Sequence, residues 1–151
     1  MYVHYFSKMI SIEEAIKTTK FTSEYHKLMV NMIYTSNRIA HAQHSFFKPY
    51  GLTTAQYNVL RILRGNYPTP YSINDIIDRM LDPMSNASRI VDKLESKALV
   101  QRKQNSTDRR AVDVLITEKG LDLLEKIDAA LDWVEQSTPG EFSEEELCNA
   151  N

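Results

Sequence analysis

The sequence contains one cysteine, four glycines and no long apolar run, and each of these shortages excludes a class of structure. The lone cysteine, Cys148, has no partner for a disulfide within the chain, which is typical of proteins from reducing compartments. No apolar stretch approaches the roughly 18 residues that a membrane-spanning helix needs. The first ten residues also lack a continuous apolar core of signal-peptide length. We therefore expect a cytoplasmic protein that does not enter a membrane.

The glycines are too far apart to form a phosphate-binding loop, in which closely spaced glycines let backbone N–H groups approach a phosphate. The sequence also contains no nucleophile elbow and no cluster of metal-ligating residues. His41 and His44 are a weak metal candidate, since a structural zinc site takes four ligands and usually includes thiolates. We therefore expect no enzyme activity, no catalytic residue, no bound metal and no cofactor.

The charges are unevenly distributed, although the formal net charge is only −2. Residues 84–110 contain seven basic and three acidic side chains, a local charge of +4. Residues 117–151 contain ten acidic and two basic side chains, a local charge of −8. A basic middle and an acidic end indicate two different roles, with the basic part suited to a polyanion.

The apolar residues predict a largely helical chain. Ser11 and Glu14 have the spacing of a capping box for a brief first helix. Apolar side chains then recur at three- and four-residue steps from about residue 22 to residue 48, which predicts a long helix ended by Pro49 and Gly51. Capping boxes also precede two shorter helices, and their residue pairs are Thr53 with Gln56 and Ser72 with Asp75.

A fourth helix is predicted from the Asp82-Pro83 pair, as an N-cap followed by a first-turn proline. Its expected apolar positions are Met84, Ala87, Ile90, Val91, Leu94 and Ala98. Residues 99–103 and 112–116 then alternate as two strands of a β-hairpin with a polar tip at residues 104–110. Thr117 caps another long helix, and Ser143 with Glu146 starts a last one after a break at Pro139 and Gly140.

This order of elements predicts a mainly α (α+β) fold, a winged helix-turn-helix with long N- and C-terminal helices. From residue 52 to residue 120 the chain resembles the MarR family of bacterial transcription regulators. The segments that carry the resemblance are "LTTAQYNVLRIL", "MSNASRIVDKLESKALVQRK" and "STDRRAVDVLITEKG". The last is the most specific, because it joins an acid and paired arginines in a wing to a strand and a T-E-K-G sequence.

The resemblance implies a division of the chain into residues 1–50 and 118–151 for dimerisation and residues 51–117 for DNA binding. It implies a homodimer bound to a pseudopalindromic operator on double-stranded DNA, usually as a repressor. It also implies that a small, often aromatic, effector could release the DNA. Seven aromatic residues between Tyr25 and Tyr67 fit such a ligand, but core packing and dimer contacts explain them as well, so the ligand-binding residues stay unknown.

The predicted fourth helix provides five candidate DNA-binding side chains, Ser85, Asn86, Ser88, Arg89 and Lys93. The N-terminal part of such a helix enters the major groove, where hydroxyl and amide groups approach base edges and arginine binds guanine or phosphate. The alternative is a solvated helix face in which Ser and Asn act as caps. The sequence does not separate the residues that read bases from those that position the helix.

The hairpin tip provides the other candidates. Arg110 is assigned by the family pattern to a narrow minor groove, which concentrates negative potential, and Arg109 lies beside it. Asp108 is itself an anion, so we expect it to pair with an arginine and hold the tip in one conformation. Arg102 and Lys103 are either phosphate contacts or ordinary edge-strand charges. Ser72 could offer donors to a phosphate, although its capping role alone explains it.

Two other functions compete with a DNA-binding regulator. A winged helix could bind a protein instead, but the basic stretch and the intact wing sequence argue against this alternative. An enzyme would need a convergent polar site, which the sequence does not contain.

Overall fold

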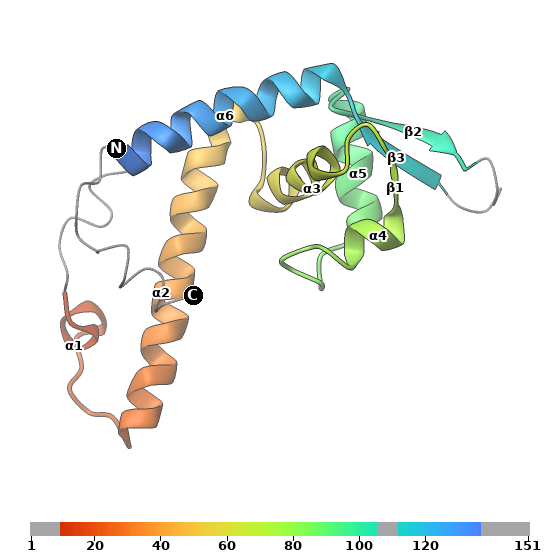
Figure 1. Ribbon diagram of the computed structural model, residues 1–151. Helices are drawn as coiled ribbons and strands as arrows, with labels where there is room; N and C mark the ends of the chain where they lie inside the picture. The colour runs from red at the N-terminus through yellow and green to blue at the C-terminus, as the bar shows by residue number, and fades with distance from the viewer. Residues whose placement is uncertain (1–9, 106–111, 137–151) are drawn as a thin grey trace. The chain divides into compact units, whose positions relative to one another are not determined.

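The computed structural model describes residues 10–105 and 112–136 (Figure 1). The chain divides into two compact units, one of Met1–Ala42 with Asp128–Asn151 and the other of Gln43–Ile127. The long helices α2 (Glu24–Phe47) and α6 (Glu118–Gln136) are each divided between the two units. The predicted wing tip (Asp108, Arg109, Arg110), the predicted last helix and Cys148 lie outside the described residues.

The first unit contains α1 (Ile12–Ile16), most of α2 and the end of α6. Ser11 caps α1, as predicted, by accepting a hydrogen bond from the backbone N–H of Glu14. Glu13 forms an ion pair with Lys27 of α2, and this hydrogen bond lowers the pKa of the Glu13 carboxyl below its ordinary value. Six large apolar side chains of α2 remain exposed in the single chain, namely Tyr25, Leu28, Met29, Met32, Ile33 and Ile39.

The second unit packs helices against a small sheet. Its helices are α3 (Thr54–Gly65), α4 (Ile73–Ile77) and α5 (Ala87–Ser96), preceded by the 3-10 helix η2 (Lys48–Tyr50). Figure 1 shows these helices gathered at one side of the strands, while the β2–β3 hairpin extends away from them. The core is aliphatic, and its fully buried members are Val59, Leu60, Leu63, Ile76, Val91, Leu94, Val100, Val114, Ile116, Leu124 and Ile127. The Phe47 ring stacks on Tyr57 at the edge of this unit.

The sheet has three antiparallel strands in the order β1-β3-β2. Strands β2 (Val100–Gln104) and β3 (Val112–Ile116) form the predicted hairpin, with Val100 opposite Ile116 and Gln104 opposite Val112. Strand β1 (Tyr71–Ser72) was not predicted, because two residues are too few to show a strand pattern. Its pairing with β3 places β2 at the edge of the sheet.

Two predicted capping boxes are confirmed in full. Thr53 accepts from the backbone of Gln56, whose side chain accepts from the backbone of Thr53. Ser72 and Asp75 make the same reciprocal pair at the start of α4. Both helices therefore begin where the local sequence indicates.

The predicted start of the fourth helix is wrong. Helix α5 begins at Ala87, and its N-cap is Asn86, whose side chain accepts from the backbone N–H of Arg89. Asp82 instead accepts from the Met84 N–H and the Ser85 hydroxyl, so its carboxylate stabilises the turn before the helix. Met84 and Ala98 are consequently not core positions of a helix. Met84 is 92% exposed, and Ala98 follows the helix with a left-handed φ of 57°.

Gly120 allows α6 to start close to the sheet. A Cβ atom at this position would lie 2.4 Å from the carbonyl oxygen of Leu99 and 2.7 Å from Cγ1 of Ile116. Thr117 also fixes this junction, because its hydroxyl donates to the carbonyl of Ala98 and accepts from the Gly120 N–H. The glycine in the first helical turn therefore serves close packing.

Candidate nucleic-acid interface

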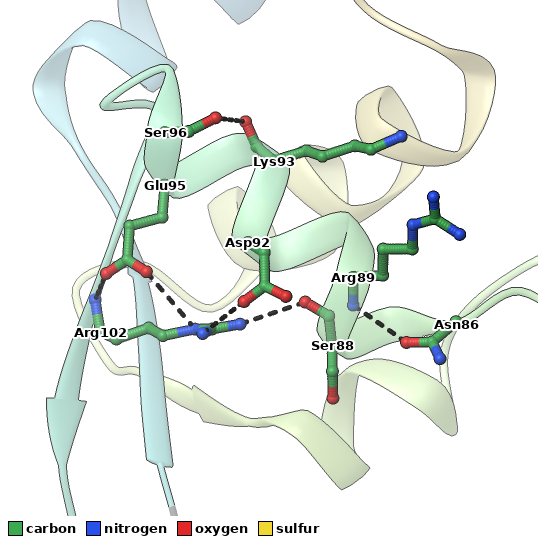
Figure 2. A network of polar contacts seen from close by, with 8 residues as sticks. All are labelled: Asn86, Ser88, Arg89, Asp92, Lys93, Glu95, Ser96 and Arg102. Carbon is green, nitrogen blue, oxygen red and sulfur yellow. Dashed lines mark hydrogen bonds and ion pairs between the residues drawn. The ribbon is translucent and has the colours of Figure 1, made fainter.

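Helix α5 has three faces with different surroundings. Ala87, Val91 and Leu94 recur at helical spacing and are buried in the second unit. Asp92 and Glu95 lie on a second face, directed toward Arg102 of β2. Arg89 and Lys93 lie on the third face and are exposed, and Figure 2 shows both side chains extending away from Arg102.

The five predicted residues of this helix are not equally available. Asn86 uses its side-chain oxygen as the N-cap, at 2.9 Å from the Arg89 nitrogen. The Ser85 hydroxyl donates to Asp82 at 2.6 Å. Ser88 is exposed, and its backbone carbonyl accepts from Arg102. Among the residues that the structure describes, none bonds to the side chains of Arg89 or Lys93, so these two cations are free to meet an anion.

A groove of about 370 Å³ separates the exposed face of α5 from the start of α3. Its lining residues are Thr53, Ala55, Gln56, Ser85, Asn86, Arg89, Ile90 and Lys93. Four of the five predicted helix residues therefore border one groove, together with the capped N-termini of two helices. Partial positive charge at these termini adds to the charge of the two side chains.

Arg102 makes its contacts within the protein (Figure 2). Its Nη1 atom lies 2.6 Å from Oδ1 of Asp92, and its Nε atom lies 3.7 Å from Oε2 of Glu95. Its Nη2 group donates to the carbonyl of Ser88, and its backbone N–H donates to Oε1 of Glu95. Two carboxylates thus surround one guanidinium, whereas the neighbouring Lys103 is exposed on β2.

Lys97 was not singled out from the sequence, and it connects two parts of the second unit. Its ammonium group donates to the carbonyl of Gly51 at 2.6 Å and to Oε1 of Gln56 at 3.0 Å. Lys119 in turn donates to the carbonyl of Lys97. No local pattern identifies these contacts, because the partners lie 46, 41 and 22 residues apart.

Both hydrogen-bond donors of Ser72, the N-cap of α4, bond to a residue of that helix. Its backbone N–H and its hydroxyl donate to the same carboxylate oxygen of Asp75, at 3.0 and 2.6 Å. These hydrogen bonds lower the pKa of the Asp75 carboxyl below its ordinary value, and the bond from the Ser72 hydroxyl has the larger effect. Asn58 of α3 was also missed, and it accepts from the Leu81 N–H in the turn between α4 and α5.

Helix α4, the turn and α5, followed by the β2–β3 hairpin, define a winged helix-turn-helix. The sequence profile of the MarR family matches residues 50–111. The transcriptional regulator MhqR of Bacillus subtilis is 36% identical over 103 residues, which are 66% of this chain and 68% of MhqR. The transcriptional repressor MdtR of the same organism is 30% identical, over 66% of this chain and 63% of MdtR. The chain belongs to the MarR family.

Solved structures agree with this assignment. The crystal structure of a MarR transcription factor from Planctomyces limnophilus is 27% identical, with a TM-score of 0.68 over 87% of this chain and 95% of that one. BpsR of Bordetella bronchiseptica is 23% identical and shares the fold, with a TM-score of 0.70 over 87% of this chain and 90% of that one. The protein is therefore a DNA-binding transcriptional regulator and not an enzyme.

Two kinds of feature are absent from the part of the chain that the structure describes. No helix among residues 10–105 and 112–136 is long and apolar enough to cross a membrane. Within the same residues, no three His, Cys, Asp or Glu side chains are grouped as a metal site would require.

Proposed function

We propose that the protein is a homodimeric repressor that acts in the cytoplasm by occupying a pseudopalindromic operator. The observation that carries this proposal is the exposed face of α5, where Arg89 and Lys93 border a groove beside two helix N-termini. In this arrangement α5 enters the major groove, Ser88 and Arg89 meet base edges, and Lys93 and Lys103 meet phosphates. Arg110 then enters the adjacent minor groove, with Arg109 beside it and Asp108 holding the tip.

The dimer is supported by the apolar face of α2. Tyr25, Leu28 and Met32 are each more than half exposed in the single chain, and they follow one another at steps of three and four residues along the helix. Burying such side chains stabilises an interface by about 25 cal/mol per Å² of apolar surface. We assign residues 1–50 and 118–151 to dimerisation and residues 51–117 to DNA binding.

Sedimentation equilibrium tests the dimer. We expect a dimer at micromolar concentration, and Met32→Asp should shift the protein toward monomer because it places a charge in an apolar interface. Asn31→Asp is the matched control, since Asn31 is an exposed polar neighbour on the same helix. A well-folded wild-type monomer at micromolar concentration would contradict the proposed interface.

Repression is supported by two relatives whose names describe repressors, MdtR of Bacillus subtilis and MprA of Escherichia coli. A dimer bound across an operator would exclude other proteins from that DNA. Release by a small aromatic effector is part of the same proposal. DNA binding of the structural neighbour BpsR is regulated by 6-hydroxynicotinic acid. In this chain, Tyr34, Asn37, Arg38 and His41 line a hollow of about 350 Å³ on α2.

Selection of DNA from a random pool tests the proposed operator. We expect the selected sequences to be inverted repeats, with half-site centres about 34–36 Å apart along the helix axis, one turn of DNA. A pool that shows no shared sequence after selection would overturn sequence-specific binding.

A further inference from the structure

We propose that Arg102 is a positioning residue that fixes the wing hairpin relative to α5 and thereby raises DNA affinity without touching DNA. We call Arg102 with Ser88, Asp92 and Glu95 the Arg102 clamp. The proposal rests on the proposed function, because it assigns a role in DNA binding to residues beside the proposed interface.

The spacing along α5 makes the clamp specific to one helix face. Ser88, Asp92 and Glu95 follow one another at steps of four and three residues, so they form one stripe along α5. The guanidinium reaches all three, through Nη2 to the Ser88 carbonyl, Nη1 to Asp92 and Nε to Glu95. A planar fork with several fixed donors can make these contacts together, whereas a lysine has a single charged point.

The clamp also provides a hydrogen-bond acceptor for a backbone N–H group at the edge of the sheet. Strand β2 is an edge strand, and the backbone N–H of Arg102 donates to Oε1 of Glu95, 3.3 Å away. Unpaired N–H groups on an edge strand are otherwise open to water or to another chain. Backbone and side chain of the same residue are therefore both held by α5, which restricts sliding as well as rotation of β2.

The charges of the clamp argue against a phosphate contact. Two carboxylates face one guanidinium, so the cluster has a net negative charge. The Arg102 side chain is 28% exposed, and its Nε atom is buried, with the 3.7 Å ion-pair contact to Glu95 but no hydrogen bond to a described residue. A DNA phosphate would meet Asp92, whose side chain is 59% exposed, as well as Arg102. The free cations Arg89 and Lys93 extend from the other side of α5 (Figure 2).

The direction in which one substitution changes DNA affinity distinguishes a positioning role from a purely electrostatic one. Asp92→Asn removes a negative charge near the proposed interface, so electrostatics alone predicts tighter DNA binding. Loss of the clamp predicts weaker binding instead, by about three- to tenfold, because the wing is no longer held in place. Asp78→Asn removes an exposed carboxylate of the same unit outside the clamp, and we expect unchanged or slightly tighter binding.

Arg102→Lys is the second variant, since it keeps the positive charge but removes the planar guanidinium group with its several donors. The clamp predicts weaker operator binding with an unchanged slope of log K against log salt concentration. Normal affinity in Arg102→Lys, or unchanged or tighter binding in Asp92→Asn, would overturn the proposal. The melting temperature of each variant is measured beside its affinity, to establish that the variants are folded.

Hydrogen exchange at the Arg102 amide tests the clamp without DNA. Glu95→Ala removes the acceptor of this amide, and we expect its exchange to become roughly tenfold faster. Unchanged exchange would show that the contact does not hold β2, which overturns the clamp. A wild-type protein that binds no DNA selectively would contradict the proposed function, and this exchange measurement would still decide on the clamp.

Discussion

The ammonium group of Lys97 lies 2.6 Å from the carbonyl oxygen of Gly51, 46 residues earlier in the chain. This contact joins the C-cap of α5 to the C-cap of the 3-10 helix η2, where Gly51 adopts a left-handed φ of 67°. The basic stretch therefore contains two kinds of cation. The side chains of Lys97 and Arg102 bond to other elements of the second unit, whereas those of Arg89, Lys93 and Lys103 are exposed and bond to no described residue.

Lys97→Met is expected to lower the stability of the protein and to leave its electrostatic attraction to DNA unchanged. The variant loses hydrogen bonds to Gly51 and Gln56 and should lower the free energy of unfolding by about 1 kcal/mol, since the site is exposed to solvent. Urea denaturation measures this loss. The slope of log K against log salt should stay at the wild-type value, and a smaller slope would mean that Lys97 contacts phosphate after all.

Arg89→Gln and Lys93→Gln are expected to show the opposite pattern, with normal stability and weaker DNA binding. Each phosphate contact that is lost should reduce the salt slope by about 0.9. If Arg89 reads a base, its substitution should also change the preference at particular base pairs, whereas Lys93→Gln should weaken all sequences alike. Binding measured against a panel of single-base operator variants separates these roles. Equal affinity of both variants and the wild type would remove this face from the interface.

Arg110→Ala is expected to weaken operator binding by a few kcal/mol at most and to flatten the preference for A·T pairs at the flanks of the site. The physical reason is that the narrow minor groove of such sequences attracts a guanidinium. Footprinting and affinity on operators with A·T or G·C flanks measure both effects. An unchanged footprint and affinity would exclude Arg110 from the minor groove.

Gly120→Ala should destabilise the second unit by about 2–3 kcal/mol, because the added methyl group collides with the Leu99 carbonyl and Ile116. Gly65→Ala is the matched control, since no atom lies within 4 Å of its added Cβ and the residue ends a helix. We expect the control to be neutral or more stable by about 0.5 kcal/mol. Thermal unfolding of the two variants compares them directly, and equal stability would contradict the close approach.

The Asp75 capping box predicts a pH dependence of stability. Hydrogen bonds from Ser72 depress the pKa of Asp75 in the folded protein below the ordinary value of 3.8. The contribution is therefore complete above about pH 4, the ordinary range of an aspartate, and is lost as the pH falls through the folded value. Asp75→Asn should thus have a lower urea midpoint than the wild type at pH 7, and the gap should close at acidic pH. Asp78→Asn is the control, and a gap that persists in acid would contradict the assignment.

Features that depend on neighbouring residues were predictable from the sequence. The two capping boxes need residues three positions apart, and the hairpin strands show their alternation within five residues each. The start of α5 was not predictable in this way, because Asp82 and Asn86 are both suitable caps. The structure uses Asn86, since the Asp82 carboxylate already bonds to Ser85 and Met84.

The candidate interface was predictable only in part. The sequence identifies the cations of the basic stretch, but it does not show which of them have partners within the fold. Arg102 bonds to Ser88, fourteen residues away, and Lys97 bonds to Gly51, 46 residues away. These distances depend on tertiary packing, as does the pairing of β1 with β3.

The most direct test of sequence-specific DNA binding is fluorescence anisotropy of the purified protein on the DNA upstream of its own gene. Scrambled DNA of the same composition is the control, and both are titrated over a series of salt concentrations. We predict tight, selective binding with a steep negative salt slope, whose size counts the neutralised phosphates. Weak binding that is equal on both DNAs would contradict an operator at that position, and the same result with selected DNA would contradict a sequence-specific regulator.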